Sequence, residues 1–238
     1  MSTSILPLQL QHVDYHIGQS HLLKNLDLKF EAGALSVILG ANGAGKTLLL
    51  KLCCGLIQAT QGQLIWANKT QRAKGQPLPY TLVFHKPVLL HRSVYENLLF
   101  ALPHLSHTQT QARIEDALQW AGIEHLADKH ALTLSTGQQQ IVAIARAWAG
   151  KPEVLFLDEP TANLDPDASE RMESLIADLH RKGTKIVMST HNLAQAKRLA
   201  DEVIFIEQGR IGEHRKAEDF FATPTCEGAQ RFLSVQGF

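Results

Sequence analysis

Short apolar runs alternate with longer amphipathic stretches along this chain, which is the pattern of β-strands followed by α-helices. The strand-like runs are residues 35–39, 80–84, 153–157, 185–189 and 203–207. The helix-periodic stretches are 47–52, 94–102, 108–121, a run that ends at Ala149, 167–181 and 192–200. Because strands that alternate with helices form parallel sheets, the pattern predicts an α/β core.

Two regions depart from this alternation. Residues 8–15 and 21–30 alternate loosely around a turn at 18–20, which predicts an antiparallel hairpin, and 62–66 reads as a further short strand. Residues 86–150 have helical patterns only, and the polar, proline-containing residues 68–79 predict a loop.

The expected organisation is a single domain over residues 1–238. Residues 1–85 and 151–238 form the α/β core with an N-terminal antiparallel β subdomain, and 86–150 form an inserted all-helical subdomain.

Composition describes an ordinary globular protein, with 45% apolar and 19% charged residues. The 23 basic and 23 acidic residues cancel, so the electrostatic footprint of a nucleic-acid binder is missing and no nucleic-acid partner is expected. Adjacent Cys53 and Cys54 are expected to be small core residues in a reducing cytoplasm. His104 and His107 lie in a polar stretch without further ligands nearby, which argues against a metal site there.

A glycine-rich segment joins the strand at 35–39 to the helix at 47–52. Its residues are Gly40, Ala41, Asn42, Gly43, Ala44, Gly45, Lys46 and Thr47. Strand, glycine-rich loop and helix in this order are the context of a phosphate-binding P-loop, whose N–H groups point into one concavity. We expect Lys46 to reach the β- and γ-phosphates and the Thr47 hydroxyl to ligate Mg²⁺. The segment therefore predicts binding of a nucleoside triphosphate.

A second acidic motif follows the apolar strand at 153–157. In a parallel sheet the carboxyl ends of the strands meet, so Asp158 is expected near Thr47, where it holds Mg²⁺ through water. Glu159 points differently and is expected to orient or deprotonate the attacking water. The alternative is an exposed acidic turn before Pro160.

Two further features have competing interpretations. Ser135 and Gln138 form a capping box, yet a serine and Gly137 at a helix start also make an anion site. Because the P-loop already wraps its own phosphates, such a site would serve the nucleotide of another copy, which predicts a twofold-symmetric pair with two shared sites. Tyr15 is either an ordinary strand tyrosine or an aromatic that stacks on a base.

These motifs together resemble the ATP-binding-cassette ATPases, over essentially the whole chain. They are Tyr15, GANGAGKT at 40–47, LSTGQQQ at 134–140, LFLDEPTANLDP at 155–166 and MSTHN at 188–192. The resemblance implies a P-loop NTPase (RecA-like) fold, ATP and Mg²⁺ as ligands, and an ATP-sandwich dimer of two copies.

The resemblance also implies roles for individual residues. Tyr15 stacks on adenine, and Ser135, Gly137 and Gln138 face the partner copy's γ-phosphate. Asp165 lies in the segment that connects the two sites, and His191 is the switch histidine that contacts the γ-phosphate and the attacking water.

Within that family the chain resembles an importer motor. Residues 88–90 and 92–97 resemble the coupling surface of importers. The stretches 86–90, 161–166 and 195–202 are most similar to ATPases of tungstate and related oxyanion importers. This implies peripheral attachment at the cytoplasmic face of the inner membrane, a separate transmembrane permease subunit and an extracytoplasmic solute-binding protein.

Three residues differ from the family pattern. His85 replaces a glutamine that approaches Mg²⁺, and imidazole is a poor ligand for this hard ion. Since histidine changes charge near neutral pH, hydrolysis is expected to become pH-sensitive there. Thr136 replaces the first signature glycine, and Ile141 replaces a common arginine.

Two other functions are open from the sequence. A soluble cassette ATPase acting on ribosomes or DNA is disfavoured by the single cassette and the zero net charge. A nucleotide-dependent interaction module with negligible turnover fits His85 and Thr136, but Glu159 argues against it.

Overall fold

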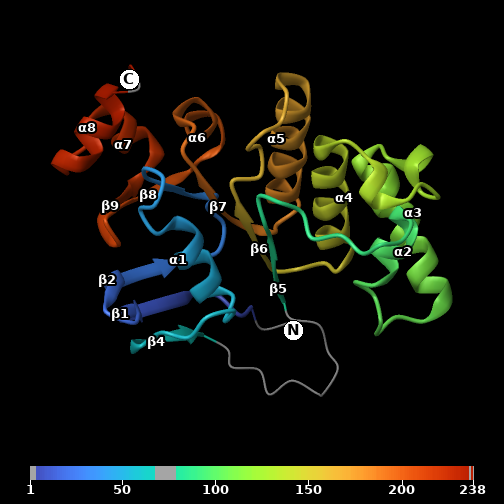
Figure 1. Ribbon diagram of the computed structural model, residues 1–238, viewed down its shortest axis with the longest axis horizontal. Helices are drawn as coiled ribbons and strands as arrows, with labels where there is room; N and C mark the ends of the chain where they lie inside the picture. Colours follow the sequence, from blue (N-terminus) through green and yellow to red (C-terminus); the bar gives the residue numbers. More distant parts are fainter. Residues whose placement is uncertain (1–3, 68–78, 236, 238) are drawn as a thin grey trace.

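The computed structural model describes residues 4–67, 79–235 and 237, which form two β-sheets and surrounding helices (Figure 1). The smaller sheet has the strand order β2-β1-β4 and is antiparallel. The larger sheet has the order β5-β6-β7-β3-β8-β9. Its first five strands are parallel, and β9 runs antiparallel to β8. The strands are β1 (Leu8–Ile17), β2 (Ser20–Phe30), β3 (Ser36–Leu39), β4 (Gln61–Trp66), β5 (Tyr80–Val83), β6 (Val154–Asp158), β7 (Lys185–Thr190), β8 (Glu202–Glu207) and β9 (Arg210–Lys216).

Helices separate most of the strands of the larger sheet. They are α1 (Lys46–Cys53), α2 (Val94–Leu99), α3 (His107–Ala121), α4 (Thr136–Ala149), α5 (Pro166–Arg181), α6 (Leu193–Leu199), α7 (Ala217–Ala222) and α8 (Glu227–Val235). Short 3-10 turns at Glu124–Leu126 and Ala131–Thr133 join α3 to α4. Figure 1 shows β1, β2 and β4 at one end of the molecule and α2 and α3 at the other, with the larger sheet between them.

Both faces of the central strands are buried, which explains their uninterrupted apolar sequence. In β6, Leu155 and Leu157 belong to one core cluster, whereas Val154 and Phe156 belong to the other. The first cluster lies under α2 to α8, and the second lies among α1, the smaller sheet and the opposite face of the larger sheet. The two cores meet at the parallel sheet, so the strand ends between them have fixed positions.

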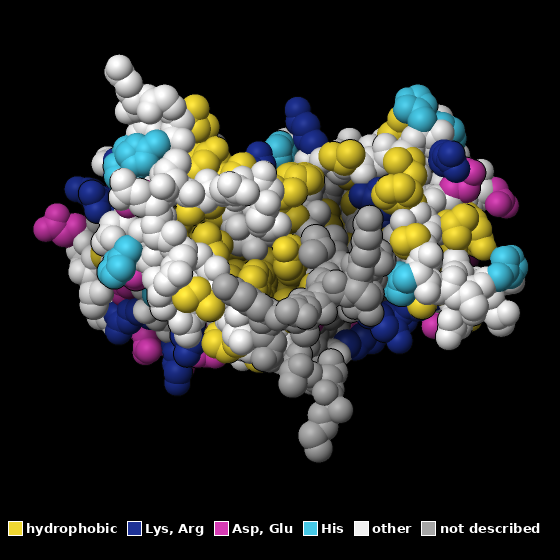
Figure 2. All heavy atoms as spheres, turned by 90° about the horizontal axis from the view of Figure 1, so that it is seen from below, with side chains coloured by type: hydrophobic (Ala, Val, Ile, Leu, Met, Phe, Trp, Pro, Cys, Tyr) yellow, Lys and Arg dark blue, Asp and Glu magenta, His cyan; other side chains and the backbone are white. Residues whose placement is uncertain are grey.

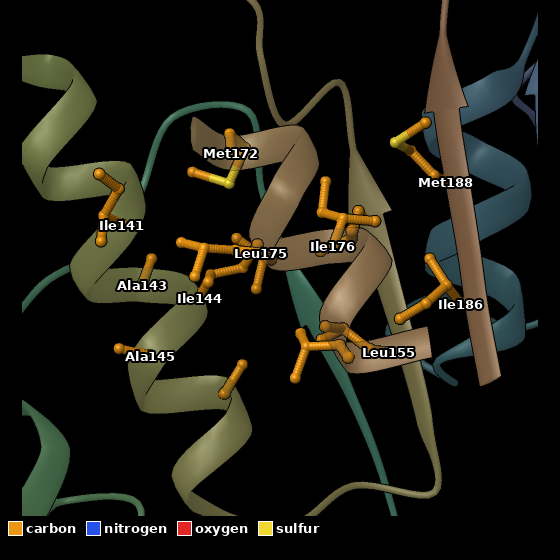
Figure 3. Close-up of a cluster of buried hydrophobic side chains, with 14 of the residues drawn as sticks. Ile141, Ala143, Ile144, Ala145, Leu155, Met172, Leu175, Ile176, Ile186 and Met188 are labelled. Atoms are coloured by element: carbon orange, nitrogen blue, oxygen red, sulfur yellow. The ribbon is translucent and has the colours of Figure 1, made fainter. Parts of the chain in front are cut away.

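The contact of α4 with α5 brings the helical segment onto the core (Figure 3). Ile144 of α4 and Leu175 of α5 point toward one another, and Ile176 faces Ile186 of β7. Ile141, which stands where the family commonly has arginine, is 3% exposed and belongs to this cluster. An apolar side chain therefore fills the position with packing rather than with polar contacts.

The predicted α/β fold, the antiparallel N-terminal β-sheet and the all-helical insertion are confirmed. A capping box of Ser93 and Glu96 begins α2. The five predicted strands of the larger sheet are parallel, as expected, and the structure adds three elements that were not predicted: the antiparallel edge strand β9 and the helices α7 and α8. The subdomain boundaries at 86 and 150 stay predictions, and the predicted loop at 68–79 lies, apart from Pro79, outside the described residues.

Among the described residues, no helix combines the length and the apolar character that crossing a bilayer requires.

Candidate active site

The loop between β3 and α1 depends on glycine at several positions. Gly43 has a φ of 79° and Gly45 a φ of 111°, in the left-handed region that side chains disfavour. A Cβ atom on Gly45 would lie 2.7 Å from Cδ2 of Leu23, and one on Gly40 would lie 2.2 Å from the carbonyl oxygen of Ile206. The close approach of β2 and β8 therefore fixes the shape of the loop.

Lys46 is held at the base of this loop. Its side chain is 5% exposed, and its Nζ donates to the carbonyl oxygens of Gly40 at 2.8 Å and Ala41 at 3.2 Å. The same Nζ lies 3.3 Å from Oε1 of Glu159. The ammonium group is thus positioned by the loop and by a carboxylate from the end of another strand.

Oxygen atoms from three segments meet beside Lys46. The Thr47 hydroxyl donates to the Asp158 carboxylate, 2.9 Å from both oxygens, and the Ser189 hydroxyl donates to Asp158 Oδ1 at 2.8 Å. Asp158 is 1% exposed, at the end of β6. Hydroxyl and carboxylate oxygens are the donor set that Mg²⁺ prefers, so these residues fit that ion.

Glu159 follows Asp158 in a conformation that is uncommon for a residue with a side chain, with a φ of 46°. Its N–H donates to the backbone oxygen and to Oγ of Ser189, both at 3.1 Å. Its Oε2 lies 3.0 Å from Nδ1 of His191. The two bonds to Ser189 hold the backbone turned, and the side chain of Glu159 reaches Lys46 and His191.

A cavity of about 370 Å³ lies over these groups. Its lining residues are Asn42, Gly43, Gly45, Lys46, Thr47, Leu48, His85, Asp158 and Glu159. The P-loop and both predicted carboxylates therefore share one cavity. His85 enters from the end of β5, with Nδ1 3.7 Å from Asp158 Oδ2 and its side chain 47% exposed.

The remaining predicted site residues do not line this cavity. Ser135 and Gln138 form a capping box at the start of α4, with Ser135 exposed, and Gly137 packs against the start of α5. Asp165 is the N-cap of α5, and its Oδ1 accepts the N–H of Ala168 at 2.8 Å. Tyr15 packs partly buried against the core beneath β1. Their roles toward a nucleotide stay predictions.

Sequence reasoning did not assign a role to Ser189. It is fully buried and bonds both Asp158 and the backbone of Glu159. The pairing of β6 with β7 puts Ser189 opposite Asp158. In the sequence, the signal for this role is the place of Ser189 in the motif at 188–192, two residues before His191.

Comparisons with known proteins agree with this geometry. Residues 23–162 match the ABC transporter family. The chain is 40% identical over 207 residues to the tungstate uptake system ATP-binding protein TupC of Peptoclostridium acidaminophilum, covering 86% of this chain and 94% of TupC. It is 35% identical over 233 residues to the glutamine transport ATP-binding protein GlnQ of Bacillus subtilis, covering 94% and 96% of the two chains.

Solved structures give the same result. The structure of cbiO1 from Clostridium perfringens, part of the ABC transporter complex cbiONQ, superposes with a TM-score of 0.80 at 29% identity and covers 97% of this chain and 95% of its own. A dimeric ATP-binding cassette bound to ADP and Pi has a TM-score of 0.76 at 27% identity, with 88% and 98% covered. The chain therefore belongs to the ABC transporter family and is an ATP-binding ATPase of that family.

Proposed function

We propose that this chain is the ATP-hydrolysing motor of an importer, and that the solute is tungstate or a related oxyanion. The observation that carries the motor assignment is the convergence of Lys46, Thr47, Asp158 and Glu159 on one cavity. A binding module without turnover needs the P-loop but has no use for Glu159 beside it.

In this proposal the P-loop binds the triphosphate of ATP. The N–H groups at the start of α1 and the Lys46 ammonium neutralise the phosphate charge. The carbonyl oxygens of Gly40 and Ala41 hold the Lys46 ammonium in position. Thr47 and Asp158 hold Mg²⁺, which, when bound, offsets negative charge on the phosphate oxygens. Ser189 orients the Asp158 carboxylate toward that task.

Hydrolysis transfers the γ-phosphoryl group to water, and Glu159 is the residue that accepts or orients the proton of that water. Its contact with His191 at 3.0 Å holds the carboxylate in one direction. His191, with 53% of its side chain exposed, contacts the γ-phosphate and the attacking water as ATP binds.

The active form is proposed to be a twofold pair of chains. Ser135, Gly137 and Gln138 do not line the P-loop cavity of their own chain, and Ser135 is exposed. In the pair, these residues of one chain would face the γ-phosphate of the ATP bound to the other chain. Tyr15 would stack on adenine, and Asp165 would lie near the connection between the two sites. The dimeric cassette bound to ADP and Pi supports this arrangement.

An apolar groove is the proposed docking surface for the transmembrane permease subunit. The groove has a volume of about 520 Å³ and is lined by β5, the segment after it, α4 and the residues that directly follow α1 and α2. Val88 and Phe100, each 67% exposed, and Leu56, 57% exposed, present apolar surface there. Hydrophobic side chains also form patches on the face seen in Figure 2. An exposed apolar surface of this kind fits a protein partner, which would hold the chain at the cytoplasmic face of the inner membrane.

The segment after β5 connects the P-loop cavity with the groove. His85 lines the cavity, and Pro87 and Val88 line the groove, where Arg146 of α4 donates to the carbonyl oxygen of Val88 at 2.8 Å. Movement at the nucleotide would thereby reach the docking surface through a few residues.

The assignment of tungstate as the solute rests on the similarity to TupC, whereas other relatives are named for other solutes. An extracytoplasmic solute-binding protein is proposed to set the selectivity of the complex. The test is ATP hydrolysis by the assembled complex with tungstate, molybdate or sulfate. Stimulation by tungstate at low concentration, lost with Glu159→Gln, supports motor and solute together. Turnover that depends on Glu159 but ignores all three anions keeps the motor and rejects the solute.

A further inference from the structure

Two imidazoles and a carboxylate converge on the hairpin of β1 and β2, outside the P-loop cavity. They belong to Asp14, His16 and His21, and one ligand atom from each lies within 4.8 Å of the others. Figure 2 shows histidine side chains at the end of the molecule where Figure 1 places this hairpin. The nucleotide chemistry proposed above uses none of these three side chains.

The backbone brings the two histidines together. His16 and His21 are direct cross-strand partners, close to the two-residue turn at Gly18 and Gln19. Side chains that are directly opposite in an antiparallel pair share one face of the sheet. Their rings stack with centroids 3.9 Å apart and an interplanar angle of 16°. The hairpin itself therefore presents the two imidazoles as a pair.

Asp14 is fixed in place beside them. Its Oδ1 accepts the backbone N–H of Asn25 at 3.0 Å and lies 2.5 Å from Nε2 of His21. Its side chain is 15% exposed, whereas that of His21 is 37% exposed, so the cluster is open to solvent on the histidine side. An anchored carboxylate with an open side is an arrangement that an ion from solution can enter.

We propose that Asp14, His16 and His21 bind a divalent transition-metal ion of the Zn²⁺ class, with water completing the coordination shell. Two imidazole nitrogens and one carboxylate oxygen are a donor set that suits Zn²⁺, whereas Mg²⁺ prefers oxygen ligands alone. Zinc bonds of about 2.0–2.2 Å put tetrahedral donor atoms about 3.4 Å apart. Binding therefore requires side-chain rotations that lengthen the His21–Asp14 contact and turn a nitrogen of His16 toward the ion.

The test is zinc titration by calorimetry of the full-length, tag-free protein after dialysis against EDTA. Excess Mg²⁺ is present to compete at the oxygen-rich P-loop site. We expect the wild type to bind one equivalent of zinc. His16→Gln and His21→Gln are each expected to lower the affinity for zinc at least about tenfold. Asp14→Asn also weakens binding, and it keeps an oxygen that accepts the Asn25 N–H. His125→Gln, a change of an exposed histidine on the 3-10 turn between α3 and α4, is the matched control and binds zinc like the wild type.

Cobalt gives a second readout. Co²⁺ bound in the same place is expected to give visible d–d absorption of a four- or five-coordinate site, and zinc displaces it. If His16→Gln and His21→Gln bind zinc as tightly as the wild type, the ion lies elsewhere and the proposal is wrong. If the wild type binds no zinc, the cluster is only an ion pair of His21 with Asp14, and the proposal is equally wrong.

Discussion

Oε2 of Glu159 lies 3.0 Å from Nδ1 of His191, across the boundary between the ends of β6 and β7. The contact joins the carboxylate that faces the P-loop cavity to a histidine that is half exposed. The backbone of Glu159 is turned to a φ of 46° and is kept there by two bonds to Ser189. Because such a conformation is unfavourable for a residue with a side chain, the surrounding bonds serve to direct this carboxylate.

Glu159→Gln is expected to lower ATP turnover by at least about 100-fold and to leave ATP binding intact. The amide keeps the size and hydrogen-bonding reach of the carboxylate but has no basic oxygen for the proton of water. Phosphate release at saturating ATP measures turnover, and a fluorescent nucleotide measures binding. Glu115→Gln, on the exposed face of α3, is the control. Turnover of Glu159→Gln near the wild-type rate would falsify the assignment of Glu159.

Ser189→Ala tests the residue that the sequence motifs did not assign. Removal of its hydroxyl leaves Asp158 with one fewer donor and removes one of the two bonds to the Glu159 N–H. We expect a higher Mg²⁺ concentration for half-maximal ATP hydrolysis and a lower maximal rate, by about tenfold or more. A Mg²⁺ titration of turnover measures both. Ser234→Ala, in α8, is the matched control, and an unchanged Mg²⁺ dependence in Ser189→Ala would contradict the assignment.

The P-loop and the two carboxylates at the end of β6 were predictable because the residues that define each motif are consecutive in the sequence. Strand, glycine loop and helix define one half of the cavity, and an apolar strand with two carboxylates defines the other. Ser189 has no such local signal, since its role arises from the register that puts it opposite Asp158.

The edge strand β9 was missed for a physical reason. The position that alternation would fill with an apolar residue holds Glu213, which is 6% exposed. Its carboxylate accepts the N–H groups of Thr225 and Cys226 and pairs with Arg215. Burial acts to raise the pKa of Glu213, but these hydrogen bonds outweigh it and lower the pKa. Because a charged residue occupies the buried position of β9, the sequence lacks the apolar alternation by which a strand is predicted.

His85→Gln tests the departure at the end of β5. Nδ1 of His85 lies 3.7 Å from Oδ2 of Asp158, beside the proposed Mg²⁺ ligands. Because imidazole is a poor ligand for Mg²⁺ and an amide oxygen suits it, the variant is expected to reach half-maximal ATP hydrolysis at a lower Mg²⁺ concentration. The measurement is a Mg²⁺ titration of turnover at saturating ATP, with His104→Gln as the control. Identical titrations for wild type and His85→Gln would remove any role of this side chain toward the ion.

Glu202→Gln tests a buried ion pair at the opposite end of the strands from the nucleotide cavity. Glu202 lies 3.3 Å from Nζ of Lys185, which is nearly fully buried, and 3.0 Å from Nε2 of His214, and it accepts the hydroxyl of Ser36. Burial alone would raise the pKa of Glu202, but the hydrogen bonds from His214 and Ser36 and the charge of Lys185 lower it to about 2. A carboxylate whose pKa is lower in the folded chain than its ordinary value of 4.5 stabilises the fold, and this stabilisation is complete above pH 4.5.

The stabilisation is therefore complete at neutral pH and is lost as the pH falls from 4.5 to about 2. At neutral pH we expect Glu202→Gln to lower the free energy of unfolding by about 3 kcal/mol, because it also leaves the Lys185 ammonium without its partner. Urea denaturation at a series of pH values measures the difference between variant and wild type, which should shrink as the pH drops through this window. Glu207→Gln, at the exposed end of the same strand, is the control. A difference that stayed constant across the window would show that the carboxylate's charge does not contribute to the stability of this fold.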